Sequence, residues 1–319
     1  FRQQVFAYLS NIEQNPASNA RAMFNRAVFG HDHVLGGIWT AALVENLSQT
    51  SLQAFHAREV APDNIKIFMI GDIDLKTARD SVEASFGSWK DKNDSTLGPV
   101  GRAMAPMPKV ILVNQPQAVQ STIIAGHAIA PFDATSNTEL TVLNAIFGGA
   151  FEARINMNLR EDKGWSYGMY SGVQSNRSGD QTLTVSGSVQ TDKTMESMQE
   201  IKREFDEFLS TNPARDDELQ RVKLNRTRSQ PGRFATKRGF LQSMMASDSF
   251  GLPFDYAEGA AERLNAVSLQ RVSARAAELM HPEELIWVIV GDLSEIEEKV
   301  RSLNYGEIEV WDGFGNKVR

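Results

Sequence analysis

The chain of 319 residues carries 33 basic and 40 acidic side chains, a formal net charge of −7, and 41% of its residues are hydrophobic. This is the composition of a globular protein with room for more than one core. The acidic balance and the absence of a Lys/Arg-rich run argue against a nucleic-acid binder. The absence of cysteine excludes disulfides, thiolate zinc sites, iron–sulfur clusters and a cysteine nucleophile.

The first 90 residues combine helical spacing with one apolar run. Apolar residues three to four positions apart predict helices near 3–29, 48–58 and 75–86. The run Ile65–Ile70 predicts a strand ending at Gly71 and Asp72. Residues 91–108 are rich in Gly, Pro and polar side chains, which is typical of a linker.

The remaining residues predict strands and helices in mixed order. Strands are expected at 110–113, 121–130, 165–174, 181–190 and 286–290, and helices at 139–147, 152–162, 195–209, 216–229 and 233–247. A turn is expected at 176–180, and Pro231-Gly232 is expected to break the helices. Hairpin-linked strands mixed with helices predict the α+β class, a repeated mixed or antiparallel sheet with helices packed on one face.

One segment of the sequence occurs twice. Phe-Gly, Ser-Leu-Gln and an apolar run ending in Gly-Asp follow one another at 29, 51 and 71, and again at 250, 268 and 291. The Gly-Asp pairs are 220 residues apart (291 − 71), so the chain holds roughly one and a half units of that length. We therefore expect a tail of a longer protein: residues 1–95 close a first domain whose front portion is missing, 96–108 are a linker, and 109–319 form a complete second domain.

The histidines indicate no metal site. His31 and His33 are the closest pair, but residues two apart do not share a helical face, and the glycines around them indicate a loop. His56, His127 and His281 stand alone and are interpreted as core or surface residues. No His-x-x-Glu-His, Gly-x-Ser-x-Gly or phosphate-binding glycine motif is present, so the residues alone give no complete catalytic constellation.

The segment 147–170 carries the candidate chemistry. Gly148-Gly149 allows a second helix to begin directly after the first, and that helix is expected to end near Arg160. Lys163-Gly164 then turns the chain into a strand, so that Arg160 and Tyr167 are expected to face one cleft. A guanidinium and a phenol form a pair of donors that holds a peptide carbonyl and stabilises its oxyanion.

A structural interpretation of the same two side chains stays open. Arg160 is then a cap of the helix C-terminus, or it pairs at the surface with Glu161 or Asp162. Tyr167 then lies on a half-buried strand without further role.

The motifs around these residues resemble those of a known family. The run Gly-Gly-x-Phe-x-x-Arg-Ile at 148–155, followed by Leu-Arg-Glu-x-x-Gly-Trp-Ser-Tyr at 159–167, resembles the second half of M16-family zinc metallopeptidases. This family includes insulysin, pitrilysin and the mitochondrial processing peptidase. The resemblance covers nearly the whole chain, and it implies four similar α+β domains, with a metallohydrolase-like fold of the LuxS and processing-peptidase type, that close around a peptide.

The resemblance also implies a division of roles between two halves. The N-terminal half carries zinc on an inverted His-x-x-Glu-His site, with the motif Glu as general base. The C-terminal half carries no metal and contributes an Arg and a Tyr seven residues apart to the substrate carbonyl. Arg160 and Tyr167 match that spacing, so the resemblance implies that they are substrate-binding residues. The implied partner is the zinc-bearing half, on the same polypeptide or on a separate subunit.

The sequence departs from the active pattern of the family near its start. Where active halves place the third zinc ligand, an approximate match gives Tyr8, which is not a plausible ligand; Glu13 lies nearby, but one carboxylate without two histidines is not a site. We therefore expect this chain to bind no catalytic zinc and to be inactive by itself.

Two functional hypotheses follow. The chain is the metal-free half of a zinc endopeptidase acting on peptides, or it is a catalytically inactive scaffold or peptide-binding subunit. Arg160 and Tyr167 together favour the first, because a scaffold has no use for the pair. No nucleic acid or membrane span is expected. The family's long bacterial members point to a periplasmic location.

Overall fold

The computed structural model describes residues 2–319 apart from 91, 93, 94, 96, 97, 99, 106, 177 and 178, and apart from the side chains of 11–13. Parts of the predicted linker at 96–108 and of the predicted turn at 176–180 therefore lie outside the described residues. The chain forms two compact units. Residues 1–40, 100–225 and 262–319 make up unit 1, and residues 41–99 and 226–261 make up unit 2. The division of the sequence into domains 1–95 and 109–319 stays a prediction.

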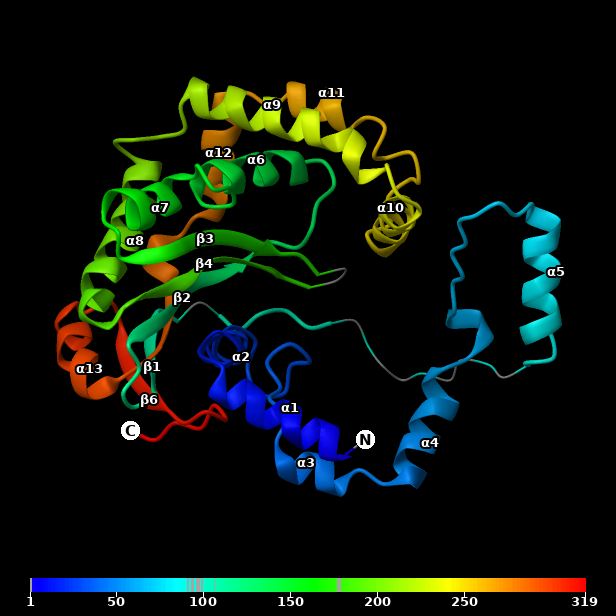
Figure 1. Ribbon diagram of the computed structural model, residues 1–319, viewed down its shortest axis with the longest axis horizontal. Coiled ribbons are helices and arrows are strands. Elements are labelled where there is room, and N and C mark those ends of the chain that lie inside the picture. The colour runs from blue at the N-terminus through cyan, green and yellow to red at the C-terminus, as the bar shows by residue number, and fades with distance from the viewer. Residues whose placement is uncertain are drawn as a thin grey trace. The chain divides into compact units, whose positions relative to one another are not determined.

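A six-stranded mixed sheet forms the centre of unit 1. Its strands lie in the order β3-β4-β2-β5-β1-β6, with β1 parallel to both of its neighbours and the pairs β2–β4, β2–β5 and β3–β4 antiparallel (Figure 1). The strands are β1 (Lys109–Asn114), β2 (Gln120–Ile129), β3 (Ser166–Gln174), β4 (Gln181–Gln190), β5 (Ile286–Gly291) and β6 (Glu307–Trp311). The predicted α+β class is confirmed.

Helices of the second repeat cover one face of this sheet. Apolar side chains of α6, α8, α12 and α13 pack there in one core that includes Phe147, Phe205 and Trp287. These helices are α6 (Asn137–Phe147), α8 (Thr194–Leu209), α12 (Leu269–Leu279) and α13 (Leu293–Ser302). The connections hold α7 (Arg154–Asn156), the π-helical turn η2 (Met157–Asp162), η3 (Thr191–Lys193), α9 (Asp216–Arg233), α11 (Ala260–Asn265) and η4 (Pro282–Glu284).

A helix of the first repeat covers the other face. Met23 and Phe24 of α2 (Pro16–Phe29) are fully buried in a second core with Val288 and Val290 of β5, and α2 lies across the sheet from α6 and α12 (Figure 1). The sequence predicted helices on one face only. The difference has a simple cause: every side chain of β5 is apolar and buried, so both faces of the strand need cover.

The predicted helix at 3–29 is two helices. Asn15 separates α1 (Arg2–Gln14) from α2, because its side chain accepts a hydrogen bond from the Ser18 amide (2.9 Å) and Pro16 occupies the first helical turn. The predicted break at Pro231-Gly232 was placed too early. Pro231 lies within the last turn of α9, and the next helix begins only at Lys237.

Unit 2 consists mainly of helices. They are α3 (Ala41–Asn46), α4 (Gln49–Glu59), α5 (Leu75–Phe86), α10 (Lys237–Ser249) and the end of α9, with η1 (Pro62–Asn64) between α4 and α5. The predicted strand at Ile65–Ile70 is wrong for this structure. A strand needs neighbours that take up its amides and carbonyls, and none of the described strands lies beside these residues.

The internal repeat is visible in the order of the elements. Five elements of the first copy have counterparts of the same kind in the second: α2 and α10, α3 and α11, α4 and α12, η1 and η4, α5 and α13. The helix caps match as well, since Asn15, Ser48 and Asp74 accept backbone hydrogen bonds as Thr236, Ser268 and Asp292 do. The run at 65–70 differs from its counterpart, since it is not a strand in this structure and β5 is.

Because α2 covers one face of the sheet, replacing a buried side chain of α2 is predicted to lower the stability of the protein strongly. Phe24→Ala is expected to lower the free energy of unfolding by about 3–5 kcal/mol, because it opens a cavity under the sheet. Phe55→Ala on the exposed α4 is the matched control and is expected to change it by less than about 1 kcal/mol. Equal effects in a urea titration would show that α2 is not an essential layer.

Candidate functional site

Arg160 lies on a widened helical turn. Residues 157–162 form a π-helical turn in which the Lys163 amide donates to the Asn158 carbonyl (3.0 Å), five residues back. Such turns are rare and are frequent at functional sites. The Arg160 side chain is about one third exposed and lies over the Phe151 ring, with its guanidinium carbon 4.5 Å from the ring centroid. Its position is therefore set by an aromatic surface as well as by the backbone.

The chain reverses between this turn and the sheet. Gly164 has φ of +67°, in the left-handed region that glycine adopts without strain. The Trp165 amide then donates to the Leu159 carbonyl (3.0 Å), and β3 begins one residue later. This turn brings the start of β3 directly after the element that carries Arg160.

Tyr167 lies in a β-bulge on an edge strand. Ser166 pairs with Val189 and Met169 with Gly187, so β3 holds one residue more than β4 over this stretch. The Ser166 hydroxyl closes the bulge, because it donates to the Ser188 carbonyl (2.7 Å) and accepts from the Gly168 amide (3.0 Å). Tyr167 is 89% exposed. Bulges of this kind redirect a side chain away from the sheet, which explains why Tyr167 is not half-buried.

A buried asparagine joins the two parts of the site. The Asn156 amide nitrogen donates to the Phe151 carbonyl (2.7 Å), and its side-chain oxygen accepts from the Met169 amide (3.2 Å). Asn156 is fully buried. One side chain therefore fixes the loop that supports Arg160 and the strand that carries Tyr167.

The motif arginine Arg154 has a structural role. Its guanidinium donates to both carboxylate oxygens of Glu218 (2.7 and 2.6 Å) and to the carbonyls of Asn212 and Pro213, and it lies over the Phe208 ring. The side chains of Arg154 and Glu218 are 8% and 2% exposed. This buried bidentate pair anchors the first turn of the element that leads to Arg160.

A polar contact also fixes the far side of the π-helical turn. The Asn158 amide donates to Glu200 (2.8 Å) and to Glu204 (2.7 Å) of α8. Burial raises the pKa of the Glu204 carboxyl, and the hydrogen bond from Asn158 opposes that rise. The sequence analysis missed Asn156, Asn158, Ser166 and Glu218, and only their position in or after the motif segment could have indicated them.

The arrangement presents two donors on adjacent elements. The surface ion pair between Arg160 and Glu161, which was the alternative to substrate binding, is present: Nε of Arg160 lies 3.3 Å from a carboxylate oxygen of Glu161. Both side chains are partly exposed. Exposed pairs contribute at most about 1 kcal/mol, so this contact leaves Arg160 available to another acceptor. No hydrogen bond of the Tyr167 hydroxyl is found within the part of the chain that the structure describes.

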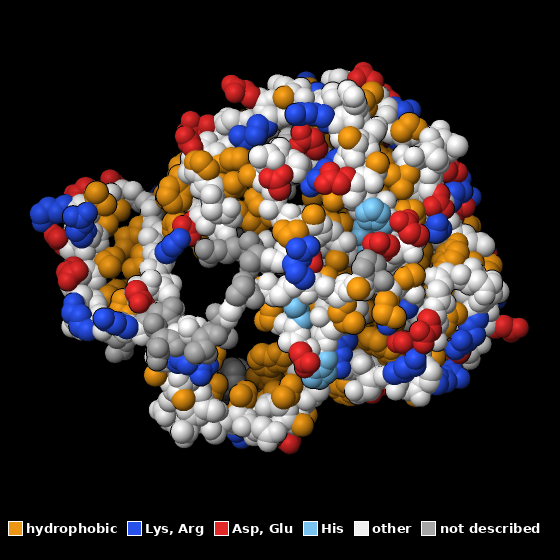
Figure 2. Space-filling view, turned by 180° about the vertical axis from the view of Figure 1, so that it is seen from behind, with side chains coloured by type: hydrophobic (Ala, Val, Ile, Leu, Met, Phe, Trp, Pro, Cys, Tyr) orange, Lys and Arg blue, Asp and Glu red, His pale blue; other side chains and the backbone are white. Residues whose placement is uncertain are grey.

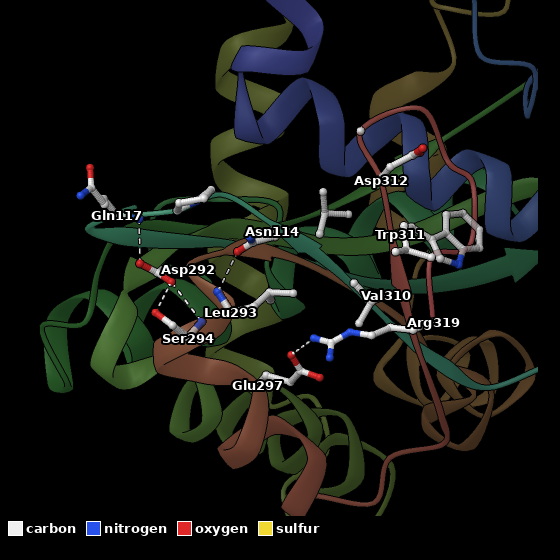
Figure 3. Close-up of a pocket in the computed structure, with 14 residues that line it drawn as sticks. Asn114, Gln117, Asp292, Leu293, Ser294, Glu297, Val310, Trp311, Asp312 and Arg319 are labelled. Carbon is white, nitrogen blue, oxygen red and sulfur yellow. Dashed lines mark hydrogen bonds and ion pairs between the residues drawn. The ribbon is translucent and has the colours of Figure 1, made fainter.

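A cavity formed by other residues lies elsewhere in unit 1 (Figure 3). It has a volume of about 780 Å³ and is lined by the ends of β1, β5 and β6 and the start of α13. Its polar groups are used in the fold: Asp292 accepts from the Gln117 and Ser294 amides, Asn114 accepts from the Leu293 amide, and Arg319 pairs with Glu297. This cavity lies far from Tyr167, because three strands separate β1 from β3 in the sheet. At the usual strand spacing, the axes of β1 and β3 are roughly 19 Å apart.

The residues that the structure describes do not fit a catalytic zinc. His33 uses both ring nitrogens, toward the Gly101 carbonyl and the Leu35 amide, and His127 is buried with its Nε2 accepting from the His281 amide. Among the described residues, no three His, Asp or Glu side chains lie close enough to hold a metal ion. Tyr8 is exposed on α1, and the Glu13 side chain lies outside the described residues. No described helix is long and apolar enough to cross a membrane.

The buried ion pair of Arg154 and Glu218 is predicted to contribute to the stability of the fold. Arg154→Ala is expected to cost about 3–5 kcal/mol of unfolding free energy, because Glu218 is left buried without a partner. Lys202→Ala, which removes the surface pair with Asp206, is the control and is expected to cost less than about 1 kcal/mol. A cost of Arg154→Ala no larger than that of the control would contradict the anchoring role.

Comparison with known proteins agrees with this description. Residues 46–226, more than half of the chain, match the model of the peptidase M16 inactive domain. An uncharacterized zinc protease of Mycobacterium tuberculosis is 27% identical over 177 residues, which cover 54% of this chain and 40% of that protein. The uncharacterized zinc protease YmxG of Bacillus subtilis is 25% identical over 169 residues, which cover 52% of this chain and 40% of that protein. The chain thus spans about 40% of the length of the curated relatives it matches.

Solved structures share the fold. A peptidase M16 inactive domain from Pseudomonas fluorescens superposes with a TM-score of 0.82 at 19% identity, covering 91% of this chain and 69% of that one. The periplasmic protease PqqL from Escherichia coli gives a TM-score of 0.72 at 13% identity, covering 91% of this chain and 32% of that one. The family model, the two motifs and the mixed sheet all point to the same family. The chain belongs to the peptidase M16 family and contains the domain described as its inactive domain.

Proposed function

We propose that this chain is the metal-free half of an M16-type zinc endopeptidase and that Arg160 and Tyr167 bind the carbonyl of the peptide bond to be cleaved. The observation that carries the proposal is the local geometry of the two donors. A π-helical turn presents Arg160, a β-bulge presents Tyr167, and Asn156 ties both elements together. The names of the relatives as zinc proteases support the reaction class.

The two donors act on the charge that develops during hydrolysis. A peptide carbonyl oxygen accepts from the Arg160 guanidinium and from the Tyr167 hydroxyl. When water adds to the carbonyl carbon, that oxygen gains negative charge and both hydrogen bonds strengthen. One such donor contributes typically ~3 kcal/mol to the transition state, or about 10² in rate.

The remaining chemistry belongs in this proposal to the N-terminal half. Zinc supplies activation of water and polarisation of the carbonyl when it is bound there. In this proposal Arg160 and Tyr167 bind and orient the substrate. The substrate is an extended peptide, because one of its carbonyl groups must be accessible to both donors. The periplasmic location is proposed with it.

The scaffold hypothesis remains the second candidate. A scaffold requires only the cores and the anchoring pair of Arg154 and Glu218. It gives no reason for an aromatic side chain that is 89% exposed in a bulge closed by Ser166, and this feature favours the enzyme half.

Hydrolysis of a quenched fluorescent peptide by the protein assembled with its zinc-bearing half tests the proposal. Arg160→Ala and Tyr167→Phe are each expected to lower kcat/KM about 10²-fold with unchanged zinc content. The matched controls are Tyr170→Phe on the same strand and Arg301→Ala on α13, and both are expected to keep wild-type rates.

The outcome separates the two candidates. Wild-type rates in both site variants would overturn the carbonyl-binding role and favour the scaffold. A loss accompanied by release of zinc would point to disturbed assembly instead, and would likewise contradict the proposed role.

A further inference from the structure

The sheet face that α2 covers changes from apolar to polar across the sheet. On β2 and β5 this face carries Ile124, Val288 and Val290, which pack against α2. Strand alternation and the pairing with β2 give β4 a different set of side chains on the same face. All four carry hydroxyl groups: Thr182, Thr184, Ser186 and Ser188. The part of the face next to the edge strand is therefore lined with hydrogen-bonding groups.

The edge strand β3 leaves this polar part of the face open. Gly172 of β3 pairs with Thr184, and Tyr170 pairs with Ser186. A Cβ at Gly172 would have no atom within 4 Å beyond its own chain neighbours, and the Tyr170 side chain is 39% exposed. A ligand can therefore approach the sheet at Gly172.

Arg21 of α2 extends to the same place. Its Nη1 donates a long hydrogen bond to the Thr184 hydroxyl (3.5 Å). Among the residues that the structure describes, no carboxylate pairs with Arg21. Other arginines have an acidic group beside them, as Arg203 has Glu200, and Figure 2 shows basic and acidic side chains interspersed over the larger part of the molecule. Arg21 thus places a positive charge without a described counter-charge beside a polar sheet face.

The guanidinium of Arg21 is also partly removed from water. Arg21 is half-buried, and burial lowers the pKa of its guanidinium without a described carboxylate that opposes the fall. At Arg203, by contrast, the hydrogen bond to Glu200 raises the pKa. Arginine stays protonated in either setting. A carboxylate that pairs with Arg21 therefore forms charge-assisted hydrogen bonds, two of them where the planar fork is accessible.

Two further polar groups around Arg21 are unused. Thr182 lies two residues before Thr184 on the same face of β4 and is 1% exposed, and its hydroxyl has no hydrogen-bond partner within the described part of the chain. The same holds for the buried side-chain oxygen of Asn25, one turn after Arg21 on the same face of α2. Since folded proteins leave few buried polar groups without partners, the surroundings of Arg21 retain hydrogen-bonding capacity for a group from outside this chain.

We infer that Arg21 is a specificity-determining residue that binds a carboxylate of the peptide substrate. Thr184 holds its guanidinium at the sheet, and the open space at Gly172 admits the peptide. The inference rests on the proposed function, because it requires that the peptide extends from Tyr167 along the face of β3.

The length of β3 sets the position of the recognised carboxylate. Gly172 lies five residues after Tyr167 on this strand (172 − 167 = 5), which is roughly 16 Å at the usual rise of a strand. An extended peptide covers that distance with about five residues. The carboxylate is therefore expected about five residues from the cleaved bond, on an acidic side chain or at the free C-terminus of the peptide.

Two sets of quenched fluorescent peptides test the inference with the full protein, including its N-terminal half. In the first set, an amidated peptide without other acidic residues carries Glu or Gln at each position about five residues from the cleaved bond. In the second set, the Gln peptide ends there in a free or an amidated C-terminus. For one carboxylate peptide we expect a KM at least about 10-fold lower than that of its neutral partner, with similar kcat, because a remote contact is made equally in the ground and transition states.

Substitutions on α2 assign this preference to one side chain. Arg21→Gln is expected to raise the KM of the carboxylate peptide to that of its neutral partner. Arg21→Lys keeps the charge but not the planar fork, and is expected to retain part of the preference. The matched control is Arg26→Gln, which removes a positive charge from the same helix and is expected to keep the whole preference.

Equal KM values for all peptides, or a preference that Arg21→Gln leaves intact, would overturn the inference even if Arg160→Ala slows hydrolysis. An unchanged preference with a lower melting temperature for Arg21→Gln than for Arg26→Gln would overturn it as well, because Arg21 would then pair with an acidic residue of the N-terminal half.

Binding of the same peptides after removal of zinc with a chelator separates this inference from the proposed function. Fluorescence anisotropy is expected to show the same preference without hydrolysis, and Arg21→Gln is expected to abolish it. That result, together with wild-type rates for Arg160→Ala and Tyr167→Phe, would support the role of Arg21 and contradict the proposed role of the other two residues. No preference in binding would overturn the role of Arg21.

Discussion

The fold depends on the need to bury both faces of one apolar strand. β5 is buried along its whole length, and a strand in that position requires neighbours on both edges and a layer on both faces. The edges are covered by β1 and β2. The helices of its own repeat cover one face, and α2, from the preceding repeat, covers the other. The second repeat therefore does not cover both faces of its sheet by itself, because one layer comes from α2.

The candidate site uses the edge of the sheet that this core leaves free. β3 is the terminal strand on one side of the sheet, and none of the described strands pairs with its outer edge. Two departures from regular geometry, a widened helical turn and a bulge, lie on either side of Gly164. Buried polar contacts of Asn156 and Arg154 hold them in place. Hydrogen bonds of buried side chains to irregular backbone are one way in which a protein fixes the positions of exposed side chains.

Much of this could be predicted from the sequence, and what was missed has physical reasons. Strands β1 to β5 follow from period-two and continuous apolar patterns, whereas the short edge strand β6 was not predicted. The repeat follows from its paired motifs. The run at 65–70 has the pattern of a strand, but pattern alone does not supply hydrogen-bond partners. The second helical layer was missed because sequence order does not reveal which sheet a helix covers. The turn of Arg160 looked like an ordinary helix, since its extra residue depends on tertiary contacts of Asn158, and Tyr167 was placed by alternation that the bulge at Ser166 interrupts.

The bulge at Ser166–Met169 has a second consequence, for solubility. An exposed edge strand is a template on which another chain extends the sheet, and proteins avoid this with bulges that break the regular ladder of amides and carbonyls. β3 is nine residues long and ends the sheet on its side. Straightening it would turn Tyr167 back toward the sheet and would also restore an uninterrupted edge. The same extra residue thus leaves the Tyr167 side chain exposed and discourages edge-to-edge aggregation between copies of the protein.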